Sequence, residues 1–105
     1  MAVKKQFTSF QDLLSSVDKP VLVDFYATWC GPCQMMAPIL EQVSNHLGER
    51  LQVVKVDTDR YPQLASQYGI HALPTLVLFK GGQPVERFEG LMQGPQLISH
   101  LQTVV

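Results

Sequence analysis

The chain has 105 residues, 46% of them hydrophobic and 16% charged, which is typical of one globular domain with a true core. Eight Lys and Arg against nine Asp and Glu leave a net charge of -1, so composition argues against binding nucleic acid or anionic membranes. No apolar run approaches the roughly 20 residues that cross a bilayer, and no export signal is visible. We expect a single domain over residues 1–105 in the reducing cytoplasm, although a processed organellar form would look the same.

The first half of the chain predicts strands alternating with helices. A short strand is expected near residues 3–7, followed by a helix over residues 8–17 in which Ser9 and Asp12 resemble a capping box. Residues 20–27 are almost continuously apolar, which is typical of a central strand covered on both faces.

The second half continues the alternation. The expected elements are a helix from the cysteines to Gly48, a buried strand over 51–57, a short helix over 61–68, a hairpin of 75–80 with 84–89, and a closing helix over 96–104. The order βαβαβαββα predicts an α/β fold, with a mixed central sheet of about five strands flanked on both faces by about four helices.

The chain's two cysteines, Cys30 and Cys33, are separated only by Gly31 and Pro32. A strand that runs directly into a helix leaves Cys30 at the helix N-terminus, where unpaired N–H groups and the macrodipole stabilise a thiolate. The thiolate is the attacking species in disulfide chemistry, so this position favours reactivity. Cys33 is expected one turn further in, shielded from solvent but able to close a small ring with Cys30.

Three interpretations of this pair compete. A structural disulfide would close a very short loop and would be unusual in a reducing compartment. A zinc site needs two more ligands, but the chain has no second cysteine pair and its histidines, His46, His71 and His100, are scattered. A redox-active dithiol is the reading that the pattern favours.

Three segments carry a family resemblance: "VDFYATWCGPC", "YGIHALPTLVLFKGG" and "EGLMQGPQL". In order and spacing, and over essentially the whole chain, the sequence resembles the thioredoxin family. The resemblance implies the thioredoxin fold and protein-disulfide reductase activity, with no cofactor and no metal. It also implies a monomer that is recharged by a thioredoxin reductase and acts on several client proteins.

The resemblance also implies roles for the core of the site. Cys30 would be the nucleophile that forms a mixed disulfide with a client, and Cys33 the resolving thiol. Asp24 matches the family's buried carboxylate, a proton acceptor for Cys33; a structural, solvent-contacting Asp is the alternative. Lys55 matches a lysine near that carboxylate, and an edge lysine with its amine in solvent is the alternative.

A client-docking surface around the cysteines follows from the same resemblance. Leu73-Pro74 matches the family's cis-proline loop, which leaves backbone groups free to pair with an extended substrate. An apolar patch would surround the exposed sulfur of Cys30. Its expected residues are Trp29, Gly31, Pro32, Leu73, Pro74, Gly90 and Leu91, with partial burial in packing as the alternative for Trp29.

Departures from the family pattern bear on substrate preference. Gln34 stands where many thioredoxins have Lys, and Glu89 where an apolar residue is common, so the rim is less positive. His71 could add a pH-dependent charge, although an uninvolved surface histidine is the plainer reading. Two other functions remain as alternatives: a disulfide oxidant or isomerase, and a non-enzymatic binding subunit. The sequence does not identify the electron donor.

Overall fold

The structure is a computed structural model that describes residues 9–105, and within them four strands form one mixed sheet. The strands are β1 (Val21–Tyr26), β2 (Gln52–Asp57), β3 (Thr75–Lys80) and β4 (Gln83–Glu89), in the order β2-β1-β3-β4. β1 pairs parallel with β2 and antiparallel with β3, and β3 pairs antiparallel with β4. The predicted mixed sheet is confirmed, and the first strand predicted near residues 3–7 lies outside the described residues.

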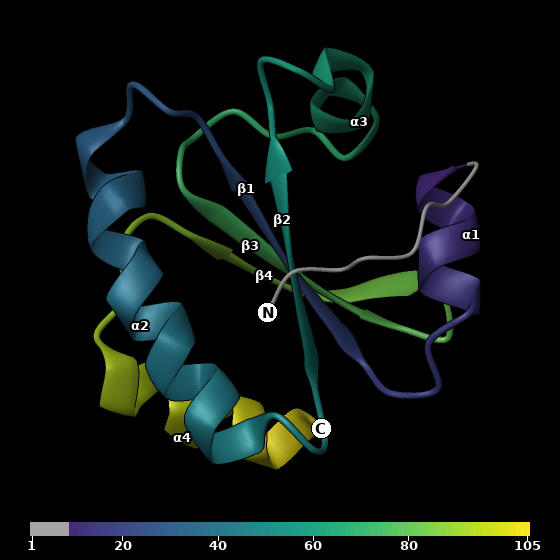
Figure 1. Ribbon diagram of the computed structural model, residues 1–105, viewed down its shortest axis with the longest axis vertical. Coiled ribbons are helices and arrows are strands. Elements are labelled where there is room, and N and C mark those ends of the chain that lie inside the picture. Colours follow the sequence, from purple (N-terminus) through teal and green to yellow (C-terminus); the bar gives the residue numbers. More distant parts are fainter. Residues whose placement is uncertain (1–8) are drawn as a thin grey trace.

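Helices cover both faces of this sheet (Figure 1). They are α1 (Phe10–Ser15), α2 (Gly31–Leu47), α3 (Pro62–Gln67) and α4 (Gly94–Val104). Buried residues of α2 and α4 pack in one apolar cluster with Leu22, Leu76 and Leu78. Side chains of α1 and Leu64 of α3 pack in a second cluster, on the opposite face, with the remaining apolar residues of β1 and β3. The predicted two-layered covering of the sheet is therefore confirmed.

Helix ends differ from the predicted ranges by a few residues. α1 begins after Ser9, whose Oγ accepts a hydrogen bond from the N–H of Asp12 at 3.1 Å, as the capping-box pattern predicts. It ends at Ser15 instead of residue 17. α4 begins at Gly94, two residues before the predicted start, because Pro95 suits the first helical turn.

The prediction that residues 51–57 form a buried strand is wrong for most of β2. Within β2 only Val56 is buried, and Lys55 is exposed. β2 is the outermost strand of the described sheet, where among residues 9–105 it pairs with β1 alone. Val53 packs against the cluster on one face, and Val54 and Val56 pack in the cluster on the other, but only Val56 is buried there. An apolar sequence identified the strand, but its position in the sheet determined its burial.

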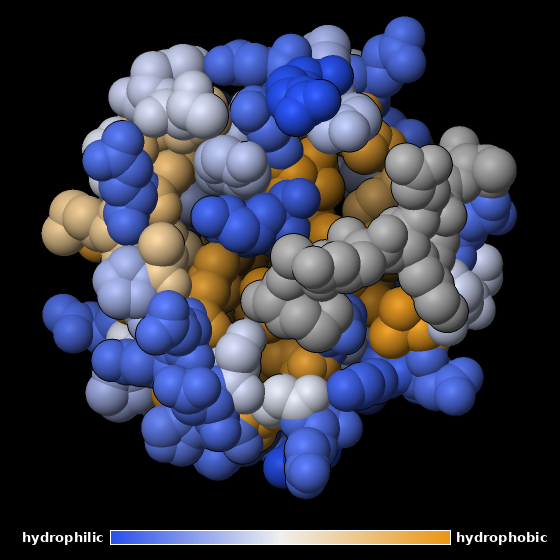
Figure 2. Space-filling model, in the orientation of Figure 1, coloured by the Kyte–Doolittle hydropathy of each residue, from blue (hydrophilic) through white to orange (hydrophobic). Residues whose placement is uncertain are grey.

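The hairpin of β3 and β4 turns at Gly81 and Gly82, as predicted. Their φ angles of 59° and 81° lie in the left-handed region that two-residue hairpin turns require and that glycine adopts readily. On the face of the molecule that Figure 2 shows, the most apolar residues lie mainly in recesses between polar side chains.

Candidate redox site

The cysteine pair lies at the junction of β1 and α2. Cys30 is the N-cap residue of α2, and its Sγ is bonded to that of Cys33 in a disulfide with a Cα–Cα distance of 5.3 Å. The backbone N–H of Cys33 donates to Cys30 Sγ at 3.3 Å. Cys30 sulfur therefore occupies the place of a capping side chain, facing unpaired N–H groups and the positive end of the helix dipole.

Solvent exposure does not separate the two cysteines. Cys30 is 6% exposed and Cys33 5%, because Ala27 packs with them and Tyr26 and Leu73 close over the cluster. In this disulfide form, Cys30 as a whole residue is therefore as buried as Cys33, and the exposure of its sulfur stays a prediction.

Asp24 lies on the same face of the sheet as α2. Side chains alternate along β1, so Asp24 shares its face with Leu22, which packs against α2 and α4. Asp24 is 1% exposed, and its Oδ1 has no hydrogen-bond partner among residues 9–105. Burial raises the pKa of this carboxyl from 3.8 to about 6, although the charge of Lys55 opposes the rise. The solvent-contacting alternative for Asp24 does not hold.

Lys55 combines both sequence interpretations. It is the register partner of Asp24 on β2, and its charge acts on the Asp24 carboxyl. Lys55 is nonetheless exposed to solvent, and its Nζ lies 4.8 Å from the centroid of the Tyr26 ring. Lys55 is an edge lysine that still acts electrostatically on the buried acid.

The Leu73-Pro74 bond is cis, as the resemblance implies. The carbonyl of Pro74 accepts a hydrogen bond from the N–H of Gly90 at 2.9 Å, which holds residues 90–91 beside the proline. Gly90 has a φ of 84°, a conformation that favours glycine. Two loops that are distant in sequence are joined at this point.

The expected docking residues differ in accessibility. Trp29, Gly31, Pro32 and Leu91 are exposed, Leu73 and Gly90 are partly buried, and Pro74 is buried. Trp29 is 71% exposed, so the alternative of partial burial in packing does not hold. A client can therefore contact the backbone beside Pro74 but little of the Pro74 side chain.

Two contacts at the rim were not foreseen from the sequence. Trp29 Nε1 donates to Asp59 Oδ2 at 2.9 Å, and Gln34 Nε2 donates to the carbonyl of Thr28 at 3.3 Å. Both contacts anchor the loop before Cys30. No local pattern marks Asp59, because it is 30 residues from Trp29 and the fold alone brings them together.

Glu89 and His71 lie near the site without joining its core. Glu89 is 3.7 Å from Arg87 in an exposed ion pair, and Arg87 also donates to the carbonyls of Tyr68 and Gly69. His71 is exposed. The acidic charge of Glu89 is thus partly compensated by its neighbour two residues earlier.

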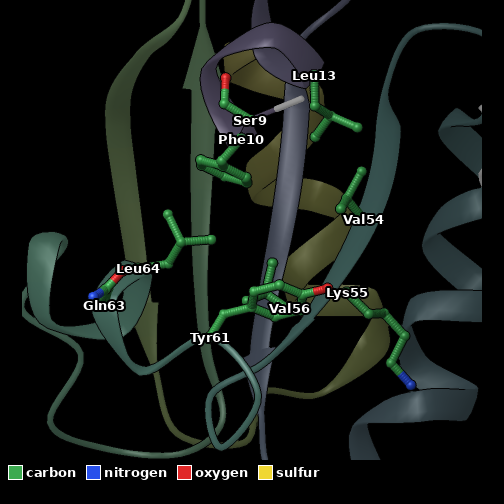
Figure 3. Close-up of a pocket in the computed structure, with 9 residues that line it drawn as sticks. All are labelled: Ser9, Phe10, Leu13, Val54, Lys55, Val56, Tyr61, Gln63 and Leu64. Carbon is green, nitrogen blue, oxygen red and sulfur yellow. The ribbon is translucent and has the colours of Figure 1, made fainter. Parts of the chain in front are cut away.

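A separate apolar pocket of about 520 Å³ lies between α1, β2 and α3 (Figure 3). Phe10, Leu13 and Leu64 are among its lining residues, and the amine of Lys55 points away from it. Its Ser9 hydroxyl already caps α1. The pocket offers no converging reactive groups.

Other kinds of site and segment find no support in residues 9–105. This part of the chain has no cluster of three or more His, Cys, Asp or Glu that could hold a metal ion. None of its helices is long and apolar enough to cross a membrane.

A redox disulfide at a helix N-terminus, beside a cis-proline on an α/β sheet, defines a thiol–disulfide exchange protein. Comparisons agree. The Thioredoxin family model matches residues 1–103. A thioredoxin-like protein of Synechocystis sp. is 68% identical over 105 residues, which is 100% of both chains. The chloroplastic thioredoxin Y1 of Arabidopsis thaliana is 57% identical over 101 residues, covering 96% of this chain but 59% of that protein.

A solved structure is also similar: a mutant thioredoxin from Halobacterium salinarum superposes with a TM-score of 0.82 at 40% identity, over 94% of this chain and 85% of that one. The chain belongs to the thioredoxin family. It is a thiol–disulfide oxidoreductase that reduces protein disulfides through Cys30 and Cys33.

Proposed function

We propose that Cys30 is the nucleophile of this reductase. In the reduced protein, its thiolate attacks one sulfur of a client disulfide, and the client's second sulfur leaves as a thiolate and takes up a proton. The observation that carries this assignment is the position of Cys30 Sγ as the α2 cap, where it accepts the N–H of Cys33. Backbone donors and the helix dipole stabilise the thiolate there.

Cys33 then resolves the mixed disulfide, and Asp24 takes its proton. The Cys33 thiolate attacks Cys30 Sγ, the client's cysteine leaves as a thiolate, and two electrons have passed from the dithiol to the client. A carboxyl with a pKa near 6 supports this role, since its ionised form is present at neutral pH to accept the proton. The unpartnered Oδ1 of Asp24 also supports it. Lys55 adjusts the basicity of that carboxylate by its charge.

Clients dock on the rim of the site. Trp29, Gly31, Pro32 and Leu91 supply exposed surface, and Leu73 supplies backbone groups before Pro74. Gly90 supports this surface through its hydrogen bond to the Pro74 carbonyl. Gln34 carries no charge, and Glu89 is paired with Arg87, so the rim of the site is not strongly positive. This rim favours clients whose binding does not depend on a positive surface.

A thioredoxin reductase recharges the Cys30–Cys33 disulfide, and several client proteins consume the electrons. The protein acts as a monomer, as one domain over residues 1–105. It works in the cytoplasm; the chloroplast, which the name of thioredoxin Y1 of Arabidopsis thaliana gives for that relative, is the competing compartment. Cell fractionation tests the compartment. Recharging by an NADPH-linked or a ferredoxin-linked reductase tests the electron donor.

Trapping of clients tests the two cysteine roles. Cys33→Ser should accumulate mixed disulfides on Cys30, because the first attack survives and the resolving attack is lost. Cys30→Ser is the matched control and should trap almost nothing. Equal capture of the same clients by both variants would refute the assignment. A double serine variant that keeps full activity in cells would instead indicate a scaffold.

A further inference from the structure

A groove of about 330 Å³ runs between α2 and the segment that leads into α4. One wall is a single stripe of α2, since Met35, Ile39 and Gln42 are spaced by four and three residues. The other wall is the segment from Leu91 to Pro95. A groove of this volume has room for a large side chain.

The lining of this groove is apolar or neutral. Among the described residues that line it, none carries a charge. Met35 is 59% exposed and Leu91 43%, while Ile39 and Met92 pack against the main core beneath them. An adaptable thioether and a branched side chain at the mouth favour an apolar occupant, because burying a charged one here would leave it unpaired.

The groove adjoins the expected docking surface, because Leu91 belongs to both. Met35 lies two residues beyond Cys33 on α2, and Leu91 follows Gly90, which is bonded to Pro74. A client linked to Cys30 by a mixed disulfide can therefore extend its neighbouring residues into this groove. At 1.5 Å per helical residue, Met35 and Ile39 lie roughly 8 and 14 Å from Cys30 along α2, which an extended chain spans in about two to four residues.

We propose that this groove is a specificity subsite for the client polypeptide. It takes a large apolar side chain located two to four residues from the client cysteine that Cys30 attacks. The subsite rests on the proposed nucleophilic role of Cys30 and adds to it a preference among clients. It selects for leucine-like side chains and against acidic or small polar ones.

Matched peptides test the subsite. Pairs of disulfide-bonded peptides differ only by Leu or Ser at one position two, three or four residues from a cysteine, on either side. The rate constant for reduction by the dithiol protein is measured for each peptide. We expect the Leu peptide to react about tenfold faster in at least one pair, as for one apolar group in a pocket.

Variants locate the source of that preference. Met35→Gln and Ile39→Gln should each bring the Leu-to-Ser rate ratio close to one. Val85→Gln, which changes an exposed apolar residue on β4, is the matched control and should keep the wild-type ratio. A ratio that survives both groove substitutions would overturn the proposal.

Other outcomes distinguish the subsite from the underlying function. Equal rates for every Leu and Ser pair, with reduction proceeding, would refute the subsite and leave the reductase intact. Failure to reduce any peptide would refute the proposed function as well. An unchanged ratio combined with self-association that Met35→Gln abolishes would replace the client with a second copy of this chain.

Discussion

The two faces of the sheet are built differently, although the same strands supply both. On the α1/α3 face, β1 and β3 present apolar side chains apart from Thr75, whose hydroxyl donates to the carbonyl of Ala72. Phe79 meets the rings of Phe10 and Tyr68 edge-on at 5.6 and 5.2 Å. On the α2/α4 face, the same strand β1 places Asp24 in line with Leu22 and leaves it buried and unpaired on one oxygen.

One face of the sheet therefore contributes to stability, and the other face carries the reactive groups. The packing of aromatic rings on the α1/α3 face should contribute the same free energy at pH 4 and at pH 8, because contacts between uncharged rings exchange no proton. Asp24 costs free energy at neutral pH, because burial disfavours its charged form. This unfavourable free energy arises only on the face of the sheet that carries the cysteines.

The largest effect is expected on the face without the site. Phe79→Ala should lower the free energy of unfolding of the oxidised protein by about 3 to 5 kcal/mol, because it leaves a cavity beneath two rings. The loss should be equal at pH 4 and pH 8 in urea denaturation. Phe79→Leu, which leaves a smaller cavity, should lose less. A loss that varies with pH would contradict the separation of the two faces.

Asp24→Asn should show the opposite behaviour on the other face. The unfolded carboxyl titrates near 3.8 and the folded one near 6, so folding takes up a proton and stability falls as pH rises between these values. Asparagine does not titrate. The substitution should therefore stabilise the protein by about 2 to 3 kcal/mol more at pH 8 than at pH 4, at 1.36 kcal/mol per pKa unit.

The same Asp24→Asn variant should also reduce a client disulfide more slowly in a single turnover, because Cys33 loses its proton acceptor. Phe79→Ala is the control for the stability measurement, since its effect has no pH dependence. Equal stability changes for Asp24→Asn at both pH values would mean that the carboxyl is not perturbed by burial, and an unchanged rate would remove it from the mechanism.

A smaller effect is expected at the start of α1. Ser9→Ala removes the acceptor for the N–H of Asp12 and should lower the free energy of unfolding by about 1 kcal/mol at both pH values. The rate of client reduction should stay at the wild-type value. Ser15→Ala, on the exposed side of the same helix, is the control and should change stability by less than about 0.5 kcal/mol.

The smallest effect is expected for Lys55→Gln. Loss of the lysine charge should raise the pKa of Asp24 further and move the pH dependence of stability upward. Because Lys55 is exposed, the change should stay below about 1 kcal/mol and should shrink at high salt. In an Asp24→Asn background, Lys55→Gln should leave the pH profile unchanged. A persistent shift there would show that the lysine acts on another group.

Local patterns predicted the elements with good accuracy. The apolar run before the cysteines became the central strand β1, and the glycine pair became the β3–β4 turn, because hydrophobic spacing and turn chemistry act over a few residues. The ends of α1 and α4 moved by a few residues, and the burial of β2 was overestimated. Those features depend on neighbours that a local pattern does not contain.

The sequence by itself determined the reactive pair. Cys30 and Cys33 are three residues apart at the start of a helix, so their ring closure and the stabilisation of a thiolate are local properties of the chain. Only the tertiary structure decided what surrounds the pair. Packing between distant segments buries Asp24 and raises its pKa, and it brings Trp29 to Asp59. It also joins Pro74 to Gly90 and forms the groove beside α2.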